Sequence, residues 1–285
     1  MHKILRGLLA ALGTVLAFGT QAADWTINAG PYVPSPQSVV ADMLKLAQVG
    51  PQDTVIDLGS GDGRIVLTAA KVFGARGFGV EIKDDLVKQA NAAAQAQGLA
   101  ARVRFMKADL FKTDVSQATV LTLYLLPHTV DLLRDKLIAE LKPGTRVISH
   151  DYPLNGWHPI KTVHMDLDDK LPISGTTTTL IFLYRVPENV AGHWRATVPA
   201  SVHTGPIDLE LEQKYTELLG AARIAGERVP IADGRIVGRK LSFTLSTRNR
   251  THAFEADVIN GAAYGVVNAA GQRAAWRANR STTAN

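Results

Sequence analysis

The sequence predicts an α/β fold, in which a mainly parallel sheet is covered by helices, followed by a small all-β domain. From residue 53 to about 186, short β-branched runs alternate with helical stretches, which is the pattern of strands joined by right-handed crossovers. The first of these strands ends in a glycine-rich turn that leads into a helix. After Pro187, short alternating runs separated by glycines replace the helical pattern. This pattern is typical of an antiparallel barrel or sandwich.

The expected elements follow from apolar residues spaced as on one helix face or in one buried strand. Strands are expected at 54–58, 77–82, 103–107, 119–126 and 146–150, and helices at 64–73, 84–97 and 129–141. Two further runs, 160–167 and 176–186, have no helical stretch between them, so they are expected to pair as an antiparallel hairpin at the sheet edge. The second domain is expected at 190–285, with strand-like runs at 192–198, 207–215, 240–245, 253–258 and 274–277.

The first 22 residues have the layout of a secretory signal peptide. Lys3 and Arg6 precede an apolar stretch at 8–18, and small residues follow it, so that cleavage is expected after Ala22. The apolar stretch has about half of the ~20 residues that a membrane-spanning helix needs. We therefore expect an exported, periplasmic protein, with an uncleaved membrane anchor as the alternative. Residues 23–52 would then hold a lid segment and the first helix, ahead of a cofactor domain at 53–187.

Composition excludes several classes of site. A chain of 285 residues that is 46% hydrophobic and 20% charged can bury a sizeable core. The absence of cysteine excludes disulfides, thiolate metal sites and a cysteine nucleophile. The eight histidines show no metal-ligand spacing, so no metal is expected. The formal charge of +5 includes Lys3 and Arg6, and the +3 that remains is too small to predict a nucleic-acid partner.

The glycine-rich turn at the end of the first strand is the most informative stretch. It contains Asp57, Gly59, Ser60, Gly61, Asp62 and Gly63. Glycines let bare backbone N–H groups approach a ligand at the carboxyl edge of a parallel sheet, where ligands bind. A dinucleotide fingerprint would need glycine at the sixth position from Gly59, which is Arg64, and no Gly-Lys-Ser/Thr follows. The pattern therefore weakens a nicotinamide or flavin interpretation and excludes a phosphate-binding P-loop.

This stretch resembles the first motif of the class I, seven-stranded S-adenosylmethionine-dependent methyltransferases, whose sheet is Rossmann-like. Glu81 closes the second strand, where that family holds both ribose hydroxyls with an acidic residue. Asp109 follows the third strand, where the family contacts the adenine amino group, and the run 123–127 ends the fourth strand beside the reactive methyl. Each carboxylate alone is more often a solvated strand end or a helix cap than a ligand. Together they imply S-adenosyl-L-methionine as cofactor, held by the turn residues and by Glu81, Ile82, Asp109, Leu110 and Leu125.

A narrower resemblance covers roughly residues 31–165. The run 31–36, the glycine turn, the run 125–127 and Tyr152-Pro153 with Trp157 resemble the small protein-lysine methyltransferase branch that in eukaryotes modifies mitochondrial carrier and ATP synthase subunits. In that branch the Tyr-Val-Pro segment folds over the cofactor, which implies a lid role for Tyr32 and Val33. A stiff, proline-rich lead into the first helix is the alternative. The export-type signal and the added β domain depart from the branch, and both leave the acceptor open.

Three side chains are candidates for acceptor positioning. Tyr124 ends the fourth strand, and His150 and Asp151 end the fifth. A lysine acceptor must lose its proton, which near pH 7 costs roughly 4–5 kcal/mol from a reference pKa of ~10.4. His150 is therefore a candidate proton acceptor, with a strand-end histidine bonded to backbone as the alternative.

Three functions remain open at this point. The first is methylation of a protein lysine, and the second is methylation of a small molecule held by the β domain. The third is a noncatalytic envelope module that binds a nucleoside, in which the β domain binds an apolar ligand or an envelope partner. No nucleic-acid partner is expected.

Overall fold

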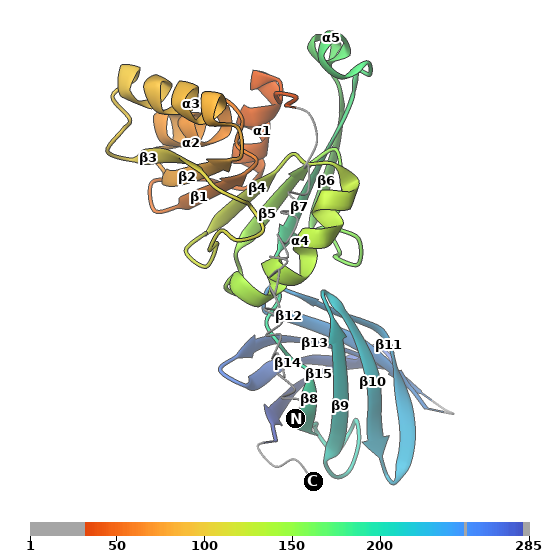
Figure 1. Cartoon of the computed structure of the whole chain (residues 1–285). Helices are drawn as coiled ribbons and strands as arrows, with labels where there is room; N and C mark the ends of the chain where they lie inside the picture. The colour runs from red at the N-terminus through yellow and green to blue at the C-terminus, as the bar shows by residue number, and fades with distance from the viewer. Residues whose placement is uncertain (1–31, 248–249, 282–285) are drawn as a thin grey trace, which may run out of the picture.

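The chain folds into an α/β sheet domain followed by a closed β-barrel, as Figure 1 shows for the computed structural model. The structure describes residues 32–247 and 250–281. The expected signal peptide at 1–22 and the first part of the expected lid segment lie outside the described residues. No helix within the described ranges is long and apolar enough to span a membrane.

The sheet has seven strands in the order β3-β2-β1-β4-β5-β7-β6. Their bounds are β1 Thr54–Leu58, β2 Arg76–Glu81, β3 Val103–Lys107, β4 Val120–Leu123, β5 Arg146–His150, β6 Lys161–Asp166 and β7 Thr178–Arg185. The first five strands are parallel, and β7 pairs antiparallel with both β5 and β6. The predicted parallel sheet and edge hairpin are confirmed, and the first strand of the hairpin is the outermost.

Helices cover both faces of this sheet, and Figure 1 shows α4 apart from the other three large helices. These helices are α1 Gln37–Leu46, α2 Arg64–Phe73, α3 Asp84–Ala96 and α4 Pro127–Glu140. Val55 of β1 packs in the cluster that contains α1 and part of α2, whereas Ile56 and Leu58 pack in the cluster that contains α4. Strands of a parallel sheet that are covered on both faces read as continuous apolar runs. The charged residue Asp57 therefore interrupts a fully buried strand.

The connection between β6 and β7 corrects one expectation, because it contains a 3-10 turn, η1 Asp168–Lys170, and a short helix, α5 Leu171–Ser174. Pro172 lies in the first turn of α5, where its missing N–H is no loss. Gly175 ends the helix in the left-handed conformation, at φ 75°. A four-residue helix is too short to produce the periodicity on which the sequence prediction depended.

The second domain is a closed barrel of eight antiparallel strands in the order β10-β11-β12-β13-β14-β15-β8-β9, which resolves the choice between barrel and sandwich. Their bounds are β8 Gly192–Thr197, β9 Ile207–Lys214, β10 Glu217–Ile224, β11 Glu227–Val237, β12 Lys240–Ser246, β13 Thr251–Ile259, β14 Ala262–Ala269 and β15 Gln272–Arg280. The sequence did not predict β10, β11 and β14. Each has a glycine inside the strand, and β11 also contains Pro230, which obscures the period-2 pattern.

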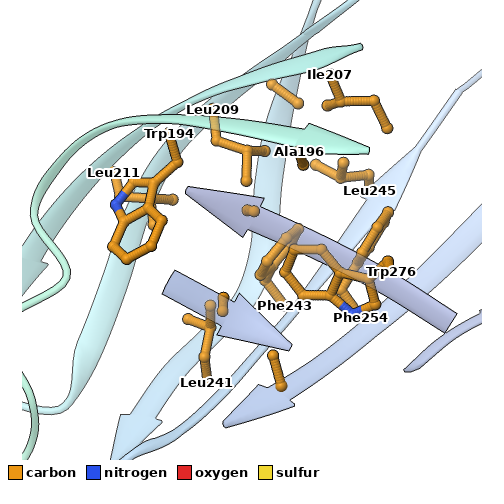
Figure 2. Packing of buried hydrophobic residues seen from close by; sticks show 14 of the residues in the cluster. Trp194, Ala196, Ile207, Leu209, Leu211, Leu241, Phe243, Leu245, Phe254 and Trp276 are labelled. Carbon is orange, nitrogen blue, oxygen red and sulfur yellow. The ribbon is translucent and has the colours of Figure 1, made fainter. Parts of the chain in front are cut away.

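The barrel interior is filled by aromatic and aliphatic side chains, several of which Figure 2 shows. The rings of Phe243 and Phe254 stack at 4.8 Å, and Trp276 packs edge-on against both of them at 5.9 and 5.1 Å. The indole N–H groups of Trp194 and Trp276 donate to backbone carbonyls at 2.8 and 2.9 Å. An apolar ligand could enter the middle of this barrel only by displacing its core.

The two domains meet at the turn between β9 and β10. The hydroxyl of Tyr215 donates to the Asp135 carboxylate on α4 at 2.7 Å, and the backbone N–H of His158 donates to the Thr216 hydroxyl at 2.7 Å. A Cβ atom on Gly156 would lie 2.8 Å from the Tyr215 ring. The barrel therefore packs against α4 and against the loop that follows β5, whose first residues belong to the ligand edge of the sheet.

Candidate active site

A cavity of about 380 Å³ lies at the carboxyl ends of the parallel strands. Most residues that the sequence suggested for the site line it. They are Tyr32, Val33, Asp57, Gly59, Ser60, Gly61, Asp62, Glu81, Ile82, Asp109, Leu110, Tyr124 and Leu125. Gly63, His150 and Asp151 are not among the described lining residues.

The glycine turn is shaped by close contacts that a side chain would prevent. Gly59 and Gly61 have φ values of 79° and 53°, in the left-handed region that favours glycine. A Cβ on Gly59 would lie 2.7 Å from Leu125, and a Cβ on Gly61 would lie 2.4 Å from the Tyr32 ring. The Tyr32 ring thus rests directly on the turn, with 38% of the residue exposed. This position is consistent with the lid role that the resemblance implied.

Gly63 has a structural place behind the cavity. It is the N-cap of α2 at φ 81°, and a Cβ there would lie 2.5 Å from the Phe105 ring and 2.9 Å from Ala90. Its missing side chain lets the helix pack against β3 and α3, and its contact with the cofactor stays a prediction. Ser60, in contrast, lines the cavity with a buried hydroxyl that has no hydrogen-bond partner among the described residues.

Glu81 is held in place by backbone donors. One carboxylate oxygen accepts the N–H of Gly61 at 3.0 Å, and the other accepts the N–H groups of Ile82 at 2.8 Å and Lys83 at 3.0 Å. This side chain therefore joins the turn after β1 to the end of β2, in addition to the N–H groups of Gly59 and Ser60, which donate to the Val80 carbonyl at 2.9 Å. A carboxylate offers about four lone-pair sites. Three of them are occupied, so about one remains, on the oxygen that accepts from Gly61, and it suits one hydroxyl of a ligand.

Asp57 is a buried charge on the cavity wall, with only 2% of the residue exposed. Burial raises the pKa of its carboxyl to about 7, although a hydrogen bond from the Thr122 hydroxyl, at 2.6 Å, opposes the shift, and the negative charges of Glu81 and Asp62 add to it. An ionised carboxylate in such a place is stabilised by a nearby positive charge. The cavity is thus prepared for a cationic ligand at this end.

Arg64, the residue that broke the dinucleotide pattern, ties the lid segment to the glycine turn. Its guanidinium donates to Asp62 at 2.6 and 3.0 Å and to the Ser35 carbonyl at 2.8 Å. Burial raises the pKa of Asp62, but the hydrogen bonds and charge of Arg64 outweigh burial and lower it overall. Asp62 is therefore a carboxylate that already has a cationic partner.

The far end of the cavity is largely apolar. Asp109 lines it, and one carboxylate oxygen accepts the Phe111 N–H at 2.8 Å, which shapes the turn after β3. Ile82, Leu110 and Phe111 provide flat apolar surface beside it. The lining residues that the sequence did not suggest are Pro34, Ser35, Arg64, Ile65, Val80, Lys83, Ala108 and Phe111. Most of them are next in sequence to suggested residues, so their position beside those residues was the signal that could have predicted them.

His150 supports Tyr124 from behind the cavity. It is fully buried, its ring stacks on Tyr124 at 3.9 Å, and its Nδ1 lies 2.9 Å from the Ser35 hydroxyl. Burial lowers its pKa to about 4, with Asp151 opposing and Lys170 reinforcing the shift. Both expectations are corrected, because the ring is neither exposed to the cavity as a proton acceptor nor bonded to backbone. It links the lid segment to Tyr124.

Asp151 is committed to an internal ion pair. Both carboxylate oxygens accept from the Lys170 ammonium, at 2.7 and 2.8 Å, and one also accepts the Leu180 N–H at 3.1 Å. Lys170 is 1% exposed and also donates to the Thr178 carbonyl. Asp151 also acts on Tyr124: burial first, and then the charge of this carboxylate and hydrogen bonding with it, raise the pKa of the Tyr124 phenol above its ordinary value. The phenol stays protonated.

Comparison with known proteins identifies the family. A family model described as the ANTKMT methyltransferase domain matches residues 57–161. A protein-lysine N-methyltransferase of Saccharolobus islandicus is 41% identical over 160 residues, which cover 56% of this chain and 95% of that protein. The chain belongs to this methyltransferase family. The adenine nucleotide translocase lysine N-methyltransferase of Mus musculus is 38% identical over 133 residues, 47% of this chain and 58% of the mouse protein. The chain thus spans little more than half the length of this animal relative.

A solved structure with bound S-adenosyl-L-homocysteine is also similar to this chain. An RNA methyltransferase from Salinibacter ruber, in complex with S-adenosyl-L-homocysteine, is 46% identical, with a TM-score of 0.50, over 55% of this chain and 96% of that chain. The chain is an S-adenosyl-L-methionine-dependent methyltransferase, so the predicted family, fold class and cofactor are confirmed. The alternative of a noncatalytic module is set aside.

The cavity of this methyltransferase is chemically suited to its cofactor. Glu81 would accept a hydrogen bond from a ribose hydroxyl, and the apolar surface beside Asp109 would take the adenine. Asp57 would face the cationic amino-acid end. When bound, S-adenosyl-L-methionine supplies a methyl group that its sulfonium has already activated, so the protein mainly has to align the acceptor.

Proposed function

We propose that this methyltransferase methylates the side-chain amine of lysine in a protein. The observation that carries the proposal is the 41% identity along 95% of the Saccharolobus protein-lysine N-methyltransferase. The charge of the cavity supports it. Among the described lining residues, four are acidic (Asp57, Asp62, Glu81 and Asp109) and two are basic, Arg64 and Lys83. An acidic cavity attracts a cationic side chain and repels a phosphate backbone.

Tyr124 is the residue that we assign to acceptor positioning. Its raised phenol pKa keeps the hydroxyl neutral, so the oxygen can accept a hydrogen bond from the amine without forming a competing charge. The stacked His150 ring fixes the orientation of the phenol. The amine must lose its proton before transfer, which costs roughly 4–5 kcal/mol near pH 7 in water. Burial against apolar neighbours such as Leu125 lowers that cost, because desolvation disfavours the ammonium form.

Tyr124→Phe tests this role, because it removes only the hydroxyl. We expect kcat to fall about tenfold or more, in the range of a lost positioning hydrogen bond of about 1.5 kcal/mol, while affinity for S-adenosyl-L-homocysteine stays within twofold. Tyr264→Phe, a matched change on an exposed tyrosine of β14 in the barrel, is the control. Equal rates for Tyr124→Phe and the unmodified enzyme would contradict the assignment.

RNA is the second candidate acceptor, because the similar structure from Salinibacter ruber is described as an RNA methyltransferase. The acceptor class can be determined by incubating the enzyme with methyl-tritiated S-adenosyl-L-methionine and a whole-cell extract. We expect label in protease-sensitive, ribonuclease-resistant material that yields methyl-lysine on acid hydrolysis. Label that ribonuclease removes would favour RNA, and label only in a small-solute filtrate would favour a small-molecule acceptor. Either result would overturn the lysine proposal.

Export is proposed on the residue pattern alone. Residues 1–22 support it, with their two basic residues, apolar stretch and small-residue end. An exported enzyme would need S-adenosyl-L-methionine outside the cytoplasm, and the barrel could then meet an envelope partner. Pulse labelling followed by cell fractionation and N-terminal sequencing tests this. We expect a mature protein that begins at Ala23 in the periplasm, and a cytosolic product that retains Met1 would contradict it.

A further inference from the structure

A second cavity, of about 240 Å³, lies at the end of the barrel that faces away from the sheet domain. The direction follows from β10, which runs from the domain junction at Glu217 to Ile224 on the cavity wall. Apolar side chains form part of the wall, namely Ile207, Ile224 and Phe254, and the polar groups include His203, Arg250 and His252. The methyltransferase site does not use any of these residues.

His252 breaks the pattern of the barrel core. The buried positions of β13 alternate, and His252 shares the inward face with Phe254, Ala256 and Val258. His252 is 8% exposed, and its buried Nδ1 has no hydrogen-bond partner among the described residues. By contrast, the inward indole N–H of Trp276 is bonded to a backbone carbonyl. A buried polar atom without a partner is unfavourable and rare, so it indicates that something else satisfies it.

The charge around His252 is positive. Burial lowers the pKa of the imidazole, and the neighbouring Arg250 and His203 lower it further. None of the described residues that line this cavity is acidic. At neutral pH the site therefore offers one permanent positive charge, on Arg250, together with imidazole nitrogens that can donate a hydrogen bond.

We propose that this cavity binds a small organic monocarboxylate. The planar guanidinium of Arg250 suits a carboxylate, which it can bind through two parallel hydrogen bonds. The buried Nδ1 of His252 gains the partner that it lacks, and Ile207, Ile224 and Phe254 cover the apolar body of the ligand. One fixed positive charge matches a monoanion better than a doubly charged phosphate. The volume lies below the roughly 300–1,000 Å³ of pockets for drug-sized ligands, which limits the size of the occupant.

The test is calorimetric titration of the full-length protein with hexanoate. Its two comparison ligands are 1-hexanol, which has the same chain without the charge, and inorganic phosphate, which has charge without an apolar body. We expect hexanoate to bind at least tenfold more tightly than either. Equal binding of hexanol would reduce the cavity to an apolar hole, and tighter binding of phosphate would make it an inorganic anion site. Either of these outcomes, or no binding of hexanoate, would overturn the proposal.

Variants locate the binding. Arg250→Gln should weaken hexanoate binding at least fivefold, and His252→Phe, which continues the apolar inward face, should abolish it while the barrel stays folded by circular dichroism. Arg223→Gln is the matched control, since Arg223 is exposed on β10 outside the cavity lining. It should leave affinity within twofold. If Arg250→Gln and Arg223→Gln weaken binding to the same extent, the assignment of the site is wrong. Methyl transfer, measured in parallel, should be unchanged in all three variants.

Discussion

The cofactor edge of the sheet and the interior of the barrel are opposite solutions to enclosing space between strands. At the sheet edge, a 380 Å³ cavity remains open beside a nearly buried aspartate with a raised pKa and an unpaired serine hydroxyl. In the barrel centre, aromatic rings fill the space and the tryptophan N–H groups are bonded. The cofactor cavity thus keeps a buried carboxyl that is costly to ionise, whereas the indole N–H groups in the barrel centre are paired. Substitutions in the two regions should therefore affect different quantities.

The largest effect is expected for Glu81→Ala. This change removes a carboxylate that would accept a hydrogen bond from the ribose and that also holds three backbone N–H groups of the site, and charge-assisted bonds contribute about 1.5–3 kcal/mol each. Affinity for S-adenosyl-L-homocysteine, measured by calorimetry, should fall by about 100-fold or more. Glu81→Gln keeps an acceptor for only one side of this pair, because Gly61 and Ile82 donate to different carboxylate oxygens, and it should show a smaller loss than Glu81→Ala. Glu227→Ala, an exposed residue in the barrel, is the control. Unchanged affinity in Glu81→Ala would remove Glu81 from the cofactor site.

Trp276→Ala should have the opposite profile. The side chain is buried among Phe243 and Phe254, and large-to-small changes of this kind cost about 3–5 kcal/mol in the free energy of unfolding. Urea denaturation should show this loss in the free energy of unfolding. Affinity for S-adenosyl-L-homocysteine should stay within twofold, since the cofactor cavity lies in the other domain. A large loss of cofactor affinity would show that the two regions are energetically coupled.

The cofactor half of this comparison could be predicted from the sequence because its signals are local. Strand-to-helix alternation and the glycine turn placed β1, α2 and the carboxylates at one edge, where topology brings the strand ends together. The support of Tyr124 could not be predicted. It depends on Ser35, which is 115 residues away from His150, and on Lys170, in a segment without periodicity. Burial of His150 is a tertiary property, so its lowered pKa and lost access to the cavity had no sequence signal.

The barrel shows the converse limit. The strands β8, β9, β12, β13 and β15 could be predicted from their alternating runs, whereas β10 and β14 contain glycines. A Cβ on Gly220 of β10 would lie 1.9 Å from the Glu210 carbonyl oxygen, and a Cβ on Gly265 of β14 would lie 1.8 Å from the Glu255 carbonyl oxygen. These residues are required by the close approach of neighbouring strands, and in the sequence they are indistinguishable from turn glycines. Closure into a barrel depends on pairing between distant strands, β8 with β15, which no local pattern encodes.

Asp57→Asn should change how the stability of the sheet domain depends on pH. The folded-state pKa of about 7 exceeds the ordinary value of 3.8, so between these values the folded protein holds a proton that the unfolded chain releases. Stability without cofactor therefore falls as pH rises through this window, and above pH 7 the full cost is present. Asparagine removes that cost. Thermal unfolding at pH 8 should show a more stable variant, by up to about 4 kcal/mol, and the difference should shrink toward pH 4. A less stable variant at pH 8 would contradict the assigned pKa.

Cofactor binding should have the reverse dependence on pH. A cationic ligand prefers ionised Asp57, so the affinity of the unmodified enzyme for S-adenosyl-L-methionine should rise by about tenfold from pH 6 to pH 8, and binding near pH 7 should release protons. Calorimetry in two buffers of different ionisation enthalpy measures the release. Asp57→Asn should bind more weakly at pH 8 and lose most of the pH dependence.

The smallest effect is expected where the two regions meet. Tyr215→Ala removes the hydrogen bond to Asp135 and the packing against Trp157 and the Arg134 guanidinium, whose centre lies 5.3 Å from the ring. Partly exposed contacts of this kind contribute about 1–2 kcal/mol together. We expect calorimetric unfolding to separate into two transitions, one for each domain, with cofactor affinity unchanged. Tyr264→Ala, an exposed tyrosine on the barrel, should leave the profile as it was. If Tyr215→Ala also lowers methyl transfer, the barrel positions the loop after β5, and the two regions act as one catalytic unit.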